Sequence, residues 1–240
     1  MIEIKDLHKK FGKQEVLKGV NISVEQGKIY AVLGPNGSGK TTIIKTILGM
    51  VIKDKGSISV NGIDIEKNAS YRNDIDYLPQ IANFPGNLKV HELIKMIKDI
   101  RGNDADETPL IELFGLQPFL KKKLSNLSGG TKQKVNLVLT FMFDSPIVIL
   151  DEPTSGLDPV AMLHLKNLIL ETKAKGKLIL ITSHIISFVE EMADEIIFLL
   201  EGTIYYKGTL EGLNEKTRET SLERAMAKLL TANKSVAQSV

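Results

Sequence analysis

Short apolar runs recur along the chain and predict strands that alternate with helices. Residues 29–33, 147–150 and 178–182 are apolar runs with the length of buried strands, and the first of them is followed by a glycine. Partial alternation of apolar and polar residues over 2–7 and 20–24 is typical of half-buried strands. These segments therefore indicate a sheet with buried central strands.

Two dipeptides predict tight turns that join further strands. Asn61-Gly62 is a strong two-residue hairpin signal, and Glu201-Gly202 marks a second turn. The strands expected beside these turns, and one more between them in sequence, lie at residues 57–60, 63–65, 75–78, 196–200 and 204–206.

Helical periodicity dominates residues 90–143, with breaks at Gly102, Pro109, Gly115 and residues 125–130. Further helices are expected at residues 40–50, 160–174 and 220–230. Strands thus alternate with helices at both ends of the chain, and a helical block separates these two parts. The pattern predicts an α/β core that carries an inserted helical lobe.

Composition and charge narrow the class of protein. The 240 residues are 42% apolar and 25% charged, which is typical of a soluble globular protein. The net charge of +2 gives no support for a nucleic-acid partner, and the lack of cysteine excludes disulfides and thiolate metal sites. We find no secretory signal and no apolar run long enough to span a bilayer, so a role at a membrane requires a partner.

Residues 34–41 match the pattern G-x-x-x-x-G-K-[ST] of a phosphate-binding loop, with a buried strand before it and a helix after it. Glycines let backbone N–H groups converge on phosphate oxygens, and the helix start adds positive potential. Lys40 is expected to reach the β- and γ-phosphates of ATP, and Thr41 to ligate Mg²⁺. A glycine-rich turn with a solvated lysine is the alternative, which the flanking strand and helix disfavour. The predicted nucleotide-binding residues of this segment are Gly34, Pro35, Asn36, Gly37, Ser38, Gly39, Lys40, Thr41 and Thr42.

Two carboxylates follow the apolar strand at residues 147–150. A central strand would bring Asp151 beside the phosphate loop, where it can hold Mg²⁺. The pleat is expected to turn Glu152 to a different side, toward the γ-phosphate, where it can act as the general base for an attacking water. Acids at a strand end are often merely solvated, but a phosphate loop upstream favours the functional interpretation.

Residues 127–133, Leu-Ser-Gly-Gly-Thr-Lys-Gln, place a serine N-cap and two glycines at a predicted helix start, which is a local anion site. An ordinary capped helix would explain this segment alone. Together with the two preceding motifs, it makes the sequence resemble the ABC ATPase family closely. The segment is similar to the family's LSGGQ-type signature, with Thr131 in place of glutamine, and implies that Ser128, Gly129 and Gly130 bind nucleotide.

The same resemblance assigns roles to four further residues. Gln80 looks like the family's Q-loop glutamine, a ligand of Mg²⁺ or water, and Asp158 lies in a segment similar to the D-loop. His184 looks like the switch histidine that hydrogen-bonds the γ-phosphate. Phe11 stands where the family has an aromatic residue that stacks on adenine, although a core phenylalanine is the alternative. The catalytic residues implied in this way are Lys40, Glu152 and His184.

The resemblance covers nearly the whole chain and implies a P-loop NTPase fold of ABC type with an antiparallel β subdomain. It implies one ABC ATPase domain over residues 1–230. The expected parts are an α/β core at 1–84 and 146–215, the helical lobe at 85–145, and a C-terminal helix and tail at 216–240.

ABC ATPases work as head-to-tail homodimers around two Mg-ATP, and the resemblance implies this for the present chain. It also implies a separate transmembrane permease and a location at the cytoplasmic face of the cell membrane. Residues 221–226 resemble the C-terminal segment of ATPases that serve ABC-2-type exporters. Residues 128–135 and 151–161 resemble the ATPase of the copper-processing transporter tied to nitrous-oxide reductase maturation.

A soluble ABC ATPase of DNA repair or translation is the alternative. The lack of cysteines, of sustained heptads and of a second ATPase domain disfavours it. The segment after Gln80 contains Phe84 and Leu88, and we expect both to line an exposed groove that receives a short helix of the permease.

Overall fold

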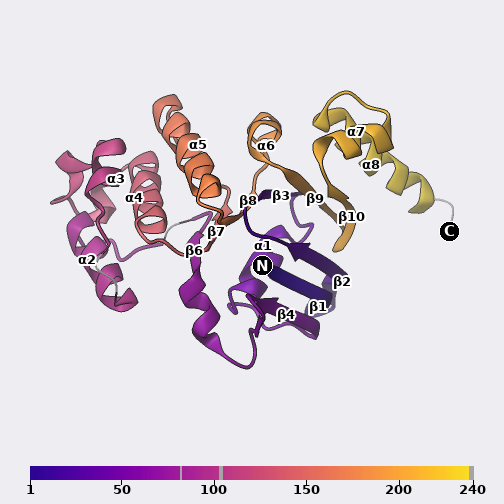
Figure 1. Ribbon diagram of the computed structural model, residues 1–240, viewed down its shortest axis with the longest axis horizontal. Helices are drawn as coiled ribbons and strands as arrows, with labels where there is room; N and C mark the ends of the chain where they lie inside the picture. Colours follow the sequence, from indigo (N-terminus) through magenta and orange to yellow (C-terminus); the bar gives the residue numbers. More distant parts are fainter. Residues whose placement is uncertain (82, 103–104, 238–240) are drawn as a thin grey trace.

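The computed structural model describes the backbone of residues 1–81, 83–102 and 105–237, and side chains as far as residue 231 (Figure 1). Its larger sheet has the strand order β10-β9-β3-β8-β7-β6, in which β10 is antiparallel to β9 and the other neighbours run parallel. The strands are β3 (Ile29–Leu33), β6 (Ile75–Leu78), β7 (Ile147–Asp151), β8 (Leu178–Thr182), β9 (Glu195–Leu200) and β10 (Thr203–Gly208).

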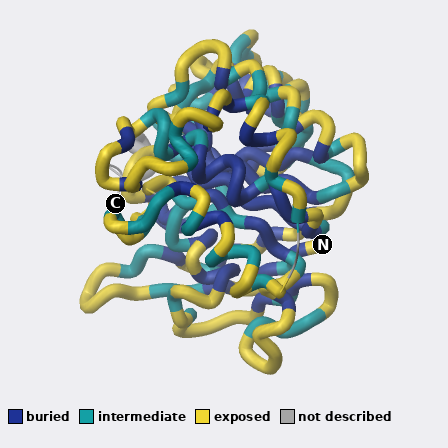
Figure 2. The backbone as a smooth tube through the Cα atoms, turned by 90° about the vertical axis from the view of Figure 1, so that its left-hand side faces the viewer, coloured by how far each residue is buried: buried dark blue, intermediate teal, exposed yellow. Residues whose placement is uncertain are grey.

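Residues of β7 show why these runs are almost entirely apolar. Ile147 and Ile149 pack toward the antiparallel sheet, whereas Val148 and Leu150 pack toward the helices on the opposite face. All four are buried. A parallel sheet covered on both faces needs an apolar residue at every position, and Figure 2 shows this buried centre beneath exposed turns.

A smaller antiparallel sheet forms the β subdomain that the family resemblance implied. Its order is β2-β1-β4-β5, and its strands are β1 (Ile2–Phe11), β2 (Gln14–Val24), β4 (Lys55–Val60) and β5 (Ile63–Asp64). The predicted hairpin at Asn61-Gly62 is confirmed, because φ is 49° and 79° at these residues, as a type I′ turn requires. Strands β1 and β2 are longer than predicted, since register shifts within their pairing hide the alternation.

Helices occupy the predicted block between β6 and β7. They are α2 (Val90–Arg101), α3 (Thr108–Leu113) and α4 (Gly129–Phe141), and they share a core with the larger sheet. Figure 1 shows them as a lobe at one end of the molecule. The boundaries proposed for core, lobe and tail stay predictions.

Outside the lobe, α1 (Lys40–Ile47) follows the phosphate loop and α5 (Pro159–Ala174) follows β7, close to their predicted ranges. Helix α8 (Leu222–Ala237) extends beyond its predicted end. We did not predict α6 (Ile186–Met192) or α7 (Leu210–Thr217), because elements of this length show too little periodicity. Within the described residues, no helix is both long and apolar enough to cross a membrane.

Candidate nucleotide site

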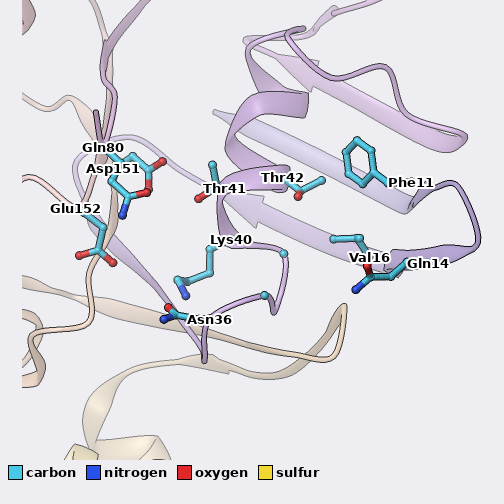
Figure 3. A pocket seen from close by; sticks show the side chains of 12 residues that line it. Phe11, Gln14, Val16, Asn36, Lys40, Thr41, Thr42, Gln80, Asp151 and Glu152 are labelled. Atoms are coloured by element: carbon cyan, nitrogen blue, oxygen red, sulfur yellow. The ribbon is translucent and has the colours of Figure 1, made fainter. Parts of the chain in front are cut away.

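A cavity of about 510 Å³ opens at the carboxyl ends of the parallel strands, where α/β proteins bind ligands (Figure 3). Strand β3 leads into the phosphate loop, β6 ends just before Gln80, and β7 delivers Asp151 and Glu152. The predicted residues that line the cavity are Phe11, Asn36, Gly37, Gly39, Lys40, Thr41, Thr42, Gln80, Asp151 and Glu152.

The phosphate loop passes tightly against β9 and β2. At Gly34, φ is 153°, and a Cβ atom there would lie 2.0 Å from the carbonyl oxygen of Leu199. At Gly39, φ is 109°, and a Cβ atom would lie 2.7 Å from Leu17. Only glycine fits these two positions, so the loop keeps the curvature that turns its N–H groups inward.

Lys40 is the half-buried cation of the cavity. Its Nζ donates to the carbonyl oxygens of Gly34 at 2.6 Å and Pro35 at 3.1 Å. Burial lowers the pKa of Lys40, and the charges of Glu152 and Asp151 oppose this change. An ammonium group held only by carbonyl oxygens can exchange one of these partners for a phosphate oxygen.

Asp151 is 2% exposed and keeps one oxygen free for a ligand. Thr182 donates its hydroxyl to Oδ1, whereas Oδ2 is buried without a hydrogen-bond partner in the described part of the chain. Burial raises the pKa of Asp151, although the bond from Thr182 opposes this change. Burial and the nearby Asp151 charge raise the pKa of Tyr77 to about 12. A cation at Oδ2 would offset the cost of burying the Asp151 charge, and oxygens of Asp151, Thr41 and Gln80 are the donors that Mg²⁺ prefers.

Glu152 lies just past the end of β7, so the pleat does not orient it as we expected. Its φ is 52°, in the left-handed region, and this turn places the side chain in the cavity wall beside Lys40 (Figure 3). Thr182 Oγ1 accepts from the Glu152 N–H at 3.1 Å and helps to hold this conformation.

His184 contacts Glu152 rather than the cavity. Its Nδ1 lies 2.7 Å from Glu152 Oε2, and its backbone N–H donates to the same oxygen at 3.3 Å. The imidazole is 73% exposed. A histidine in this place can hold the carboxylate and still reach a ligand from outside.

The signature residues lie elsewhere, at the start of α4. Ser128 is exposed and caps this helix, accepting from the Thr131 N–H at 3.3 Å. The Thr131 hydroxyl is 2.9 Å from the Ser128 hydroxyl. None of the described residues that line the cavity belongs to this segment, so one chain does not bring Ser128, Gly129 or Gly130 to its own phosphate loop.

Asp158 has a structural partner on α4. It caps α5 by accepting from the Ala161 N–H at 2.9 Å, and it forms an ion pair with Lys134 at 2.6 Å. The bond from Lys134 holds the pKa of Asp158 below its usual range. Asp158, Gly34, Pro35 and Ser38 are not among the described lining residues.

Three residues of the site escaped the sequence analysis. Gln14 and Val16 line the cavity beside Phe11, because the turn of the β1-β2 hairpin brings them there (Figure 3). Thr182 holds Asp151 and Glu152 from the neighbouring strand. The sequence offered one signal for Thr182. It is a hydroxyl residue at the end of a predicted strand, as Asp151 and Glu152 are acids at the end of another.

Comparisons with known proteins agree with this geometry. The family model described as ABC transporter matches residues 17–155, more than half of the chain, and a model of an AAA domain matches 121–190. A lantibiotic transport ATP-binding protein of Streptococcus pyogenes is 35% identical over 216 residues, covering 88% of this chain and 92% of the relative. A bacitracin transport ATP-binding protein of Bacillus licheniformis is 33% identical, covering 91% of this chain and 73% of the relative.

Solved structures repeat the fold over nearly the full chain. An ATP-binding subunit of an ABC transporter has a TM-score of 0.91 and 33% identity, covering 96% of this chain and 99% of that one. A dimeric ATP-binding cassette bound to ADP and Pi has a TM-score of 0.79 at 23% identity, which supports the fold.

The fold and the cavity define a P-loop nucleotide-binding protein. The chain belongs to the ABC transporter family, as an ATP-binding subunit that hydrolyses ATP. Both curated relatives are transport proteins, and the alternative of an ATPase for DNA repair or translation is not supported.

Proposed function

We propose that the cavity binds ATP with Mg²⁺ and that Glu152 is the base for hydrolysis. The observation that supports this most strongly is that Lys40, Asp151 and Glu152 line one cavity behind the phosphate loop. Phe11, at the opposite end of this cavity in Figure 3, would stack on adenine. The loop amides and Lys40 would then hold the phosphates beside the two acids.

Thr41, Gln80 and Asp151 are the residues we assign to Mg²⁺. The partnerless Asp151 Oδ2 and the neutral oxygens of the other two suit a small cation that also binds phosphate oxygens. When bound, Mg²⁺ would neutralise charge on the transferred phosphoryl group.

In the proposed step, Glu152 accepts a proton from a water whose oxygen attacks the γ-phosphorus. The bond from this phosphorus to the oxygen of ADP breaks, and ADP and phosphate are released. His184, which contacts Glu152 Oε2, would keep the carboxylate oriented and donate to the γ-phosphate.

We further propose a head-to-tail homodimer in which Ser128, Gly129 and Gly130 of one copy complete the site of the other. The exposure of Ser128 and Gly129, and the absence of all three residues from the described lining of the same chain's cavity, support this arrangement. Asp158, which ties α5 to Lys134, would then hold the segment beside the signature at the interface.

Mixing two inactive variants tests the dimer. Lys40→Ala removes the phosphate contact, and Ser128→Arg blocks the signature. A mixed dimer carries both lesions at one site and leaves the other site intact, so we expect partial recovery of ATPase activity. Mixed dimers that form, as judged by tag-selective capture, but stay inactive would contradict completion in trans.

A second cavity, of about 540 Å³, is the surface we assign to the permease. Its apolar lining includes Leu48, Ile75, Phe84, Ile97, Leu139 and Phe143. Exposed Lys45 and Arg72 stand at its rim, and neither forms an ion pair with any described residue. We therefore expect a short apolar helix of the permease that carries an acidic residue.

Phe84 lines this cavity as predicted, but Leu88 does not. Leu88 packs against the apolar core of the lobe, and its carbonyl oxygen accepts from the Leu124 N–H at 2.8 Å. Phe84 is partly buried against the same core, so the two residues differ in that Phe84 is among the described lining residues of the cavity and Leu88 is not.

Phe84→Asp tests the surface, with Leu170→Asp as the matched control on the exposed side of α5. We expect Phe84→Asp to abolish co-purification of the membrane subunit while ATP affinity is kept. The Leu170→Asp control should bind both the membrane subunit and ATP. Unchanged capture by Phe84→Asp, or equal loss in the control, would show that the permease docks elsewhere.

We propose an exporter-type system at the cytoplasmic face of the cell membrane. The transport relatives support this assignment, and so does the resemblance of residues 221–226 to ATPases of ABC-2-type exporters. The likeness to the copper-processing ATPase stays a prediction that the identity of the co-purified permease would test.

A further inference from the structure

Asp76, on the edge strand β6, is a buried carboxylate outside the nucleotide cavity. It is 1% exposed, and it forms an ion pair with Arg101. Ser145 donates to it twice, from its hydroxyl at 2.9 Å and from its backbone N–H at 3.2 Å. Burial raises the pKa of Asp76, and the charge of Arg101 opposes this change. The carboxylate is thus held by groups from outside its own strand.

Arg101 and Ser145, which hold Asp76, lie where two helices of the lobe end or continue toward the sheet. Arg101 is the last residue of α2, and its guanidinium also donates to the carbonyl oxygen of Ile75 at 3.1 Å. Ser145 lies in the connection that leads from the end of α4 to β7. In the same connection, the ring of Phe143 lies 4.6 Å from the guanidinium carbon of Arg101. Asp76 therefore joins the C-terminal end of α2, and the connection that follows α4, to the sheet.

Helix α4 lies between the Asp76 cluster and the signature at Ser128. It begins next to Ser128 and ends at Phe141, and its thirteen residues span about 20 Å at 1.5 Å per residue. Asn136, in its middle, donates to the carbonyl oxygen of Pro79, next to Gln80, at 3.3 Å. Because a helix moves as a nearly rigid rod, a shift at its C-terminal end also shifts Ser128 at the other end, where Gln133 and Lys134 hold α4 to Pro153 and Asp158.

The residues of this ion pair also line the cavity that we assign to the permease. Asp76, Arg101 and Phe143 line it together with Phe84. A segment that enters this cavity contacts the groups that hold α2 and α4. Occupation of the cavity and placement of the signature thus depend on the same side chains.

We infer that Asp76 and Arg101 are positioning residues that set the orientation of α4 and so place Ser128 for the ATP site of a second copy. The inference rests on the proposed head-to-tail dimer. It adds a requirement outside the phosphate loop and the signature, in which the ion pair of buried Asp76 with partly exposed Arg101, beyond the C-terminal end of α4, controls how tightly ATP closes the dimer.

Four variants in a Glu152→Gln background, which retains ATP, test this inference. Asp76→Asn and Arg101→Met each break the pair, and the double variant removes both charges, so it leaves no buried charge unpaired. Asp144→Asn is the control in the same connection, since the Asp144 side chain is 83% exposed and its ion pair is with Lys177, not with Asp76 or Arg101. ATP affinity is measured on the monomer, dimerisation by sedimentation, and stability by denaturant unfolding.

We expect the single and double variants to weaken ATP-driven dimerisation about tenfold, within the usual range of coupling between sites. ATP affinity of the monomer should stay within about twofold, because none of the cavity contacts changes. The double variant should regain stability without regaining dimerisation, which a merely structural pair would not show. The control should match the parent.

Dimerisation of the double variant at the parent's strength would overturn the inference and leave the proposed dimer intact. Loss of monomer ATP affinity in the same proportion as dimerisation would also overturn it. A Glu152→Gln parent that fails to dimerise with ATP would overturn the proposed dimer itself, and this inference with it.

Discussion

The phosphate loop and the start of α4 carry similar anion-binding chemistry in opposite surroundings. The loop ends in a half-buried lysine and faces two buried acids across a cavity. The start of α4 presents Ser128 and Gly129 to solvent. The same backbone amides at a helix start therefore make an enclosed site in one place and an open surface in the other. This difference supports our proposal that the second region is half of a site that another copy of the chain closes.

The buried region also differs in its backbone. Glu152 takes a left-handed φ of 52°, and neighbouring groups hold it there, namely Thr182 and His184. Ser128 has ordinary N-cap geometry, with φ −64° and ψ 161°. Of these two regions, the left-handed non-glycine residue lies in the one that we propose performs chemistry, and surrounding contacts maintain it there.

The largest expected effect comes from Glu152→Gln. The amide keeps the shape of the side chain but cannot accept a proton, so kcat should fall by about 10²–10⁴-fold. ATP affinity should be kept, and the variant should elute as an ATP-bound dimer on size exclusion. Turnover at the wild-type rate would remove Glu152 from the role of base.

A smaller effect is expected from Thr182→Val, which keeps volume and removes the hydroxyl. Asp151 Oδ1 then loses its donor in a buried site, whereas the Glu152 N–H loses one of two acceptors and keeps the Thr182 carbonyl oxygen at 3.1 Å. An unsatisfied buried group costs about 1–3 kcal/mol, so we expect a fall in kcat of about tenfold or more and lower stability.

The matched control for this prediction is Thr182→Ser, which retains the hydroxyl. It should keep most of the activity, and steady-state ATPase assays beside thermal unfolding would compare the two. If serine and valine reduce kcat equally, packing at this position matters and the hydroxyl does not.

The smallest effect is expected from Phe11→Ala, at the opposite end of the cavity. Phe11 is 51% exposed, and an aromatic contact is worth about 0.5–1.5 kcal/mol, so KM for ATP should rise about two- to tenfold with kcat unchanged. Phe11→Tyr keeps the ring and should match the wild type. An unchanged KM in Phe11→Ala would show that adenine does not stack there.

Local motifs predicted much of this molecule. The pattern at residues 34–41, the acids after the strand at 147–150, and the hairpin at Asn61-Gly62 each depend on a few neighbouring residues, and the structure places all of them in the predicted elements. Their chemistry follows from backbone geometry over short segments, which sequence order determines directly.

Other features needed the three-dimensional arrangement. Thr182 meets Asp151 only because β8 pairs with β7, and Arg101 meets Asp76 only because α2 ends beside β6. Leu88 is not among the described residues that line the groove, and this depends on how the segment after Gln80 packs against the lobe core. Glu152 leaves the pleat because residues of a neighbouring strand and loop hold it. The sequence by itself determined which segments bind phosphate and carry acids. Only the tertiary structure decided which distant side chains hold them, because those contacts join residues 25 or more positions apart.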